Sequence, residues 1–188
     1  MGLSSRTASR QAKSSRTHTH TRQVQYSARA IGHRVIGIDH SSKKDLVLSS
    51  GAEHFLPLDG TDSLADAVKA VTGGHGAHAV VVCTAHQGAY DVSVDLLRFG
   101  GRVVCVGIPE GDMKPIGSAN AGILVAKALQ IVGSAVGTRK EAIEAVEFAA
   151  RGIVKTHYRV ERMGALTDVF REMDAQKLKG RVVIDLSE

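Results

Sequence analysis

HRVIGIDHSSKK, residues 33–44, is the stretch that decides the fold. It predicts a short apolar strand over 34–39 that ends in an acid and leads into a helix over 43–50. The same alternation of strand and helix patterns continues to residue 186. Such alternation is typical of a parallel sheet with helices on both faces, in which ligands bind at the carboxyl ends of the strands. The predicted fold class is therefore α/β, a doubly wound parallel sheet of the Rossmann type.

The remaining elements follow from apolar runs bounded by glycine or proline. Continuous runs such as HAVVVCT and RVVCVG predict strands that are buried on both faces. We expect further strands over 54–59, 78–84, 102–107, 130–136 and 181–186. We expect helices over 23–31, 63–71, 87–99, 140–151 and 166–175.

The totals describe a soluble globular body with a basic front end. Hydrophobic residues make up 43% of the 188 residues and charged residues 23%, and no apolar run approaches the ~20 residues that span a bilayer. Residues 1–38 hold seven Lys or Arg and no acid. The other residues therefore carry 24 − 7 = 17 basic against 19 acidic side chains. We expect neither a membrane nor a nucleic-acid partner, because no recognition motif accompanies the arginines.

Two segments follow from this composition. Residues 1–22 are rich in Ser and Arg and are expected to be disordered, with the folded domain over 23–188. A mitochondrial presequence is the alternative for 1–22, although its apolar face is poor. Cys83 and Cys105 each lie in a valine-rich strand, which favours a reducing compartment, and we expect the cytoplasm.

Asp39 stands where an acid holds a ribose in dinucleotide-binding folds, about 20 residues after a glycine-rich turn. Residues 3–31 contain no glycine. Without it the backbone cannot make the tight turn that approaches a pyrophosphate. We therefore expect that the glycine loop and the first, central strand before it are missing from the sheet.

Four segments in order make the sequence recognisable: HRVIGID, RFGGRVVCVGIPEG, QIVGSAVGTRKEAIEAVEFAARGIVK and LKGRVVID. Together they resemble the cofactor domain of zinc-dependent medium-chain alcohol dehydrogenases, and most closely the fungal, yeast-type enzymes. The resemblance covers about residues 24–188. It implies an NAD-linked oxidoreductase that transfers a hydride between a small alcohol and an aldehyde or ketone.

The resemblance also implies roles for single residues. Asp39 corresponds to the acid that binds both adenosine ribose hydroxyls, and its charge favours NAD over NADP. Lys44 matches a lysine beside the adenosine, and Arg181 matches an arginine that reaches the pyrophosphate. The alternatives are a turn residue for Asp39, a solvated lysine for Lys44 and a structural ion pair for Arg181.

Three apolar residues acquire a role through their backbone position alone. In the family that the sequence resembles, Val106 and Ile108 flank the turn that meets the nicotinamide. Val136 lies in the segment that receives the carboxamide. As side chains, all three would otherwise be ordinary core residues.

The resemblance does not extend to the family's catalytic domain, so we expect no zinc site and an impaired activity in this chain. His75, His78, Cys83 and His86 have a superficially zinc-like spacing, but a strand of ~3.3 Å per residue separates the first two from the last two. The alternative function is a non-catalytic remnant, or a mis-joined gene product, that binds nucleotide weakly or associates with an intact subunit. The edge strand 130–136 could then form a homo-oligomer.

Overall fold

The computed structural model describes residues 18–109, 111–155, 158–175, 178 and 181–187, with side chains from residue 24 onward. Most of the predicted disordered segment 1–22 lies outside these residues. So does any strand or loop that precedes residue 18. The prediction that the central strand and the glycine loop are missing therefore stays a prediction.

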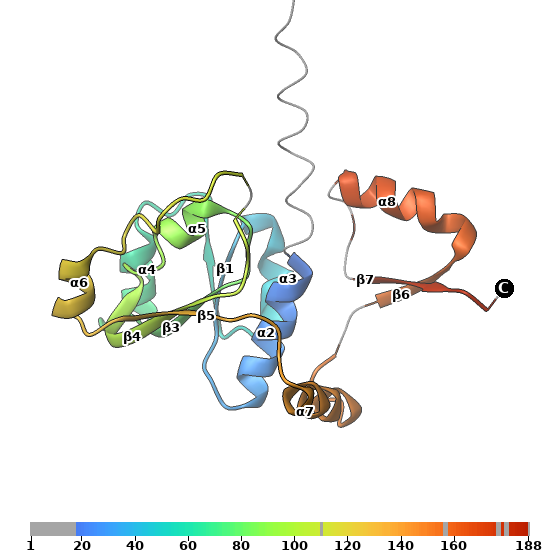
Figure 1. Cartoon of the computed structure of the whole chain (residues 1–188), viewed down its shortest axis with the longest axis horizontal. Helices are drawn as coiled ribbons and strands as arrows, with labels where there is room; N and C mark the ends of the chain where they lie inside the picture. The colour runs from blue at the N-terminus through green and yellow to red at the C-terminus, as the bar shows by residue number, and fades with distance from the viewer. Residues whose placement is uncertain (1–17, 110, 156–157, 176–177, 179–180, 188) are drawn as a thin grey trace, which may run out of the picture.

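The described strands form three separate sheets of parallel strands, each of which is called a ladder below (Figure 1). In the first, β1 (Ile36–Asp39) pairs with β2 (His54–Pro57). In the second, β4 (Leu97–Cys105) lies between β3 (Ala77–Val82) and β5 (Gln130–Gly133). In the third, β6 (Tyr158–Arg162) pairs with β7 (Arg181–Asp185). The predicted parallel α/β class is confirmed, and no ladder joins β1 to β3 within the described residues.

The described helices lie before β1 or between consecutive strands. They are α2 (His18–Ala30), α3 (Lys44–Ser49), α4 (Leu64–Val71), α5 (Gln87–Asp91), α6 (Ala121–Ala126), α7 (Arg139–Ala150) and α8 (Leu166–Asp174). Two 3-10 turns, η2 (Ser41–Lys43) and η3 (Met163–Ala165), precede α3 and α8. α2 begins five residues before the helix predicted from residue 23. None of these helices is long and apolar enough to cross a bilayer, within the part of the chain that the structure describes.

The main core lies against β3 and β4. Its buried members are Val82, Tyr90, Val94, Leu97 and Val103. Val103, at the centre of β4, has 0% of its surface exposed. The core therefore holds β3, β4 and the short helix α5 together.

The predicted helix 87–99 is wrong in its second half, because α5 ends at Asp91 and β4 already begins at Leu97. Val94 is β-branched and loses rotamer freedom in a helix. The hydroxyl of Ser93 donates to the carbonyl of Tyr90 at 2.7 Å, a local bond that competes with helical pairing. The chain then passes through turns into β4.

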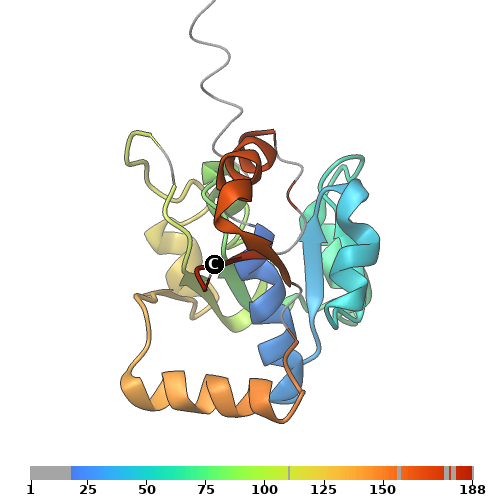
Figure 2. The same cartoon turned by 90° about the vertical axis from the view of Figure 1, so that its right-hand side faces the viewer.

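The other differences lie at the carboxyl-terminal end of the chain. The predicted strand 130–136 ends at Gly133, and Val136 has a φ of +45°, which no strand accommodates. The strand β6 was not predicted. Figure 1 shows the unit of β6, β7 and α8 standing apart from the β3–β4–β5 ladder. Figure 2 shows α7, which has no buried residue, at the bottom of the view, apart from the strands.

Candidate functional site

Asp39 is the last residue of β1 and stands at the carboxyl end of the first ladder. Its Oδ1 accepts the backbone N–H of His40 at 2.8 Å. Its backbone carbonyl accepts the N–H of Leu58 at 2.9 Å, which joins the ends of β1 and β2. Asp39 is half-buried, so part of the residue still faces solvent. The hydrogen bond from the N–H of His40 orients its carboxylate. An acid fixed in this way can accept hydrogen bonds from a ligand with two neighbouring hydroxyls.

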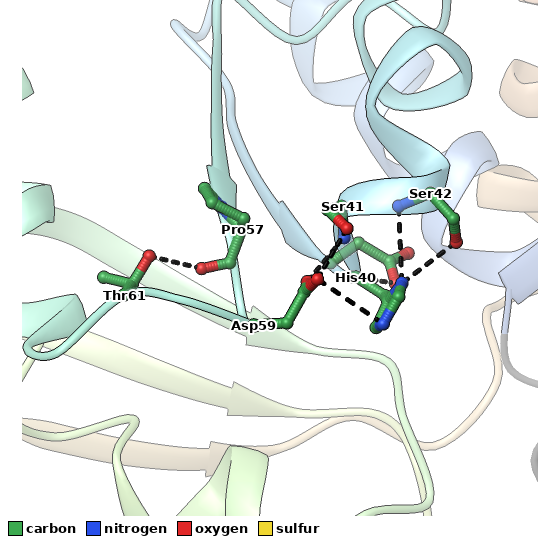
Figure 3. A network of polar contacts seen from close by, with 7 residues as sticks. His40, Ser41, Ser42, Pro57, Asp59 and Thr61 are labelled. Carbon is green, nitrogen blue, oxygen red and sulfur yellow. Dashed lines mark hydrogen bonds and ion pairs between the residues drawn. The ribbon is translucent and has the colours of Figure 1, made fainter.

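A second carboxylate, Asp59, closes the loop that follows Asp39 (Figure 3). Asp59 Oδ1 accepts the N–H of Ser41 at 2.6 Å, and Asp59 Oδ2 accepts the Ser41 hydroxyl at 2.5 Å. His40 Nε2 lies 3.5 Å from Asp59 Oδ2. The hydroxyl of Ser41, and then its N–H, lower the pKa of Asp59 below its ordinary value. Asp59 is therefore an anion at neutral pH.

His40 also caps the 3-10 turn η2 from its other side. Its Nδ1 accepts the N–H of Ser42 at 3.3 Å and lies 3.0 Å from the Ser42 hydroxyl. The first residues of the turn are thus fixed by two side chains, Asp59 at Ser41 and His40 at Ser42. This network was not predicted from the sequence, although Asp59, two residues after the end of β2, was a usable signal.

The second half of the site is formed by the carboxyl ends of β3, β4 and β5. The N–H groups of Val106 and Gly107 both donate to the carbonyl of Val82, at 3.1 and 2.8 Å. The N–H of Ser134 donates to the carbonyl of Cys105 at 2.9 Å. These bonds bring the turn after β4 against the residues that follow β3 and β5.

Gly107 is required at this turn by close approach rather than by its φ. A Cβ at Gly107 would lie 2.3 Å from the carbonyl oxygen of Thr84 and 2.8 Å from the carbonyl carbon of Cys83. No side chain fits at such distances. The turn between Val106 and Ile108 is therefore packed backbone against backbone.

The helix α5 anchors the loop that leaves this turn. The Tyr90 hydroxyl donates to the carbonyl of Gly107. Gln87 Nε2 donates to the carbonyl of Pro115 at 3.0 Å, and Asp91 Oδ1 accepts the N–H of Gly117 at 3.1 Å. Gln87 and then Gly117 lower the pKa of Asp91. The loop after β4 is thus held at three points by one short helix.

The predicted site residues fall into separate groups. Val106 and Ile108 lie at the end of β4, and Val136 follows the neighbouring β5. The Ile108 side chain is 84% exposed and that of Val136 is 99% exposed, so neither is a core residue. Asp39 belongs to the β1–β2 ladder.

The two predicted basic residues lie elsewhere. Lys44 is exposed at the start of α3, five residues after Asp39. Arg181 is half-buried at the start of β7, in the third ladder. The structure thus places Lys44 near the end of β1 but leaves Arg181 on a different ladder.

The two cysteines are free thiols at the β3 and β4 ends. Burial raises the pKa of both Cys83 and Cys105. Burial, together with the two thiols, raises the pKa of the Tyr90 hydroxyl. Among the described residues, no group of three or more His, Cys, Asp or Glu is placed to hold a metal ion.

Residues 24–151 match the family described as zinc-binding dehydrogenase. Alcohol dehydrogenase 2 of Emericella nidulans is 52% identical over 171 residues, which are 87% of this chain and 47% of that protein. Alcohol dehydrogenase of Schizosaccharomyces pombe is 41% identical over 166 residues, which are 88% of this chain and 46% of that protein. The chain therefore spans about half the length of the curated relatives that it matches.

The fold has counterparts among solved structures. A crystal structure of an NAD-dependent alcohol dehydrogenase superposes with a TM-score of 0.72 at 22% identity. The match covers 86% of this chain and 46% of that one. At this identity the match shows a shared fold, which is the doubly wound arrangement predicted from the sequence.

Proposed function

Because the chain belongs to the zinc-binding dehydrogenase family, we propose that it is the NAD-binding part of an alcohol dehydrogenase-like oxidoreductase. Its substrates would be a small alcohol and the corresponding aldehyde or ketone. The single observation that carries the proposal is Asp39, a half-buried carboxylate fixed at the carboxyl end of a parallel strand. An acid in this position accepts hydrogen bonds from the adenosine ribose in doubly wound folds.

The residues present fit the adenosine half of NAD. Asp39 Oδ1 is oriented by the N–H of His40, and Lys44 stands at the start of the next helix. We propose that Asp39 binds the ribose hydroxyls and that Lys44 lies beside the adenosine. The negative charge of Asp39 would disfavour a ribose that carries a 2′-phosphate.

The β4 end supports the other half of the proposal. Val106 and Ile108 flank a turn whose backbone is fixed by Val82 and by Tyr90. We propose that this backbone orients the nicotinamide, and that the segment at Val136 receives its carboxamide. When bound, the nicotinamide supplies the hydride chemistry. Arg181 is proposed as the pyrophosphate ligand on the family resemblance alone.

Titration of intrinsic NADH fluorescence with the purified chain tests the proposal. We expect binding in the micromolar range and a roughly tenfold loss of affinity in Asp39→Asn, because a charge-assisted hydrogen bond is lost. Asp45→Asn is the matched control, since it removes an exposed carboxylate from the first turn of α3. Absence of NADH binding up to millimolar concentration, or equal losses in the two variants, would contradict the proposal.

A second candidate is a non-catalytic chain that associates with an intact subunit. It is favoured by β5, which pairs only with β4 among the described ladders and exposes Ile131 and Val132. Exposed apolar strand edges are templates for pairing. Sedimentation of the wild type and of Val132→Lys, each alone and mixed with an intact relative, tests it. A complex that is lost in Val132→Lys supports pairing, and a wild type that stays monomeric in both settings excludes it.

The proposed setting is a reducing compartment. The two cysteines are unpaired in the structure and lie in or directly after strands. The cytoplasm fits this chemistry, and mitochondria remain the alternative. Fractionation of cells that express a tagged chain, followed by detection of the tag, distinguishes the two.

A further inference from the structure

The loop after β1 contains a second carboxylate beside the proposed ribose acid. Asp39 is in register with Pro57, and the N–H of Leu58 donates to the carbonyl of Asp39 at 2.9 Å. Asp59 is the next residue. The two carboxylates therefore lie at the carboxyl ends of paired strands, on the same side of the first ladder.

Asp59 is occupied by the donors of the loop that follows Asp39 (Figure 3). The N–H and the hydroxyl of Ser41 reach its two oxygens at 2.6 and 2.5 Å, and His40 Nε2 stands at 3.5 Å. These groups of Ser41 and His40 surround the carboxylate of Asp59 as they would surround a bound anion. The anion here is a side chain of the protein itself.

A backbone N–H, a hydroxyl and an imidazole are also the groups that bind a phosphate monoester. Lys43 and Lys44 follow in the sequence and would add positive charge near such a phosphate. The loop therefore has the composition of a phosphate-binding loop. What distinguishes it is that its donors already serve Asp59.

We propose that Asp59 is a specificity-determining residue that excludes nucleotides with an adenosine 2′-phosphate, by holding with its own carboxylate the donors that this phosphate needs. The inference rests on the proposed function, because it assumes that the adenosine ribose lies at Asp39. It differs from charge repulsion by Asp39 alone. Removal of Asp39 leaves Ser41 and His40 engaged with Asp59, so it gains little affinity for a 2′-phosphate.

The test uses adenosine 2′-monophosphate and adenosine 5′-monophosphate, which share the ribose and differ in the position of the phosphate. Binding of each to the ¹⁵N-labelled full chain is measured by NMR. In Asp59→Ala we expect 2′-monophosphate affinity to rise at least tenfold, or about 1.4 kcal/mol, with the Ser41 amide shifting most. Affinity for the 5′-monophosphate should change less than about twofold, because its phosphate lies away from the loop.

Two variants separate this role from a general effect. Asp59→Glu keeps the anion and should keep the 2′-monophosphate out. Asp66→Asn removes an exposed carboxylate on α4 that pairs with Lys69, and should leave both affinities unchanged. Ser41→Ala added to Asp59→Ala should abolish the gain. Asp59→Asn repeats the test with an uncharged side chain of the same shape, should the alanine variant be unstable.

The outcomes distinguish this inference from the proposed function. If Asp59→Ala and Asp59→Asn bind adenosine 2′-monophosphate no better than the wild type, the inference is overturned. If Asp66→Asn gains as much as Asp59→Ala, net charge explains the result and the inference is also overturned. A wild type that does not bind NADH contradicts the proposed function. If Asp59→Ala then still gains affinity for adenosine 2′-monophosphate in a way that depends on Ser41, the role of Asp59 is supported.

Discussion

Gly107→Ala is the sharpest perturbation of the site, because it adds one methyl group where backbone meets backbone. The new Cβ would lie 2.3 Å from the carbonyl oxygen of Thr84, whereas ordinary contacts begin at 3.4 Å. The turn after β4 must therefore move by about 1 Å relative to the end of β3, and a packed interior resists such a shift. Gly107 also accepts the hydrogen bond of the Tyr90 hydroxyl, which the movement would strain.

The cost follows from these two effects. Overpacking of this kind costs about 1–3 kcal/mol, and weakening one part-buried hydrogen bond adds about 1 kcal/mol. For a chain of this size, the sum lowers the melting temperature by roughly 6–12 °C. Thermal unfolding followed by circular dichroism measures the shift, with urea unfolding as an independent estimate of the free energy.

Gly88→Ala is the matched control, since it adds the same methyl group within α5 and meets nothing within 4 Å. It should leave stability unchanged, or raise it by up to about 1 kcal/mol, because alanine favours a helix over glycine. If Gly107→Ala unfolds at the same temperature as Gly88→Ala, the close approach of β3 and β4 is wrong. If Gly107→Ala is destabilised as expected, affinity for NADH should fall with it, because the turn at Val106 moves.

Val103→Ala should lower the free energy of unfolding in urea by about 2–3 kcal/mol, because it empties part of the buried core. Val81→Ala, at a position 43% exposed, should lower it by less than about 1 kcal/mol, and equal losses would contradict the assigned core. Thr138→Ala removes the capping box with Glu141 and should cost α7 about 1 kcal/mol, seen as faster amide exchange within α7 and not in α5. Because the folded-state pKa of Asp59 is lowered, its contribution to stability is present above its ordinary pKa and lost as the pH falls through the folded-state pKa. Urea midpoints measured from pH 7 to about pH 3 should therefore fall less steeply in Asp59→Asn than in the wild type, and parallel curves would refute the pairing with Ser41.

The strands were predictable where apolar runs are continuous. RVIGID and HAVVVCT were placed within two residues of β1 and β3, because a continuous apolar run is a strong strand signal. The expectation that HAVVVCT is buried on both faces is wrong, because only Val82 of β3 is buried and Val81 is 43% exposed. The helix 87–99 was misjudged, since its apolar spacing suits both a helix and a turn leading into a strand. Tertiary contacts of Val94 and Leu97 in the core decide between the two structures, and a sequence pattern does not contain these contacts.

The candidate site was only half visible in the sequence. Asp39 could be found because a strand followed by an acid is a local pattern. The pairing of Ser41 with Asp59 joins residues 18 positions apart, and it exists only because β1 and β2 lie side by side. Tyr90 donates to Gly107 over 17 positions for the same kind of reason, since α5 packs against the ends of β3 and β4.

The separation of the β1–β2 ladder from the β3–β4–β5 ladder has a consequence for how ligand binding and stability depend on each other. Within the described residues no strand pairing couples the two ladders, and the main core lies under only one of them. We therefore expect the two ladders to open independently, each with its own free energy. A dinucleotide that reaches from Asp39 to Val106 contacts both, so its binding free energy opposes the opening of either unit. The observed affinity is then the intrinsic affinity reduced by the fraction of molecules in which both units are closed together. In this chain, NAD would act as a cross-link between two halves as much as a reactant.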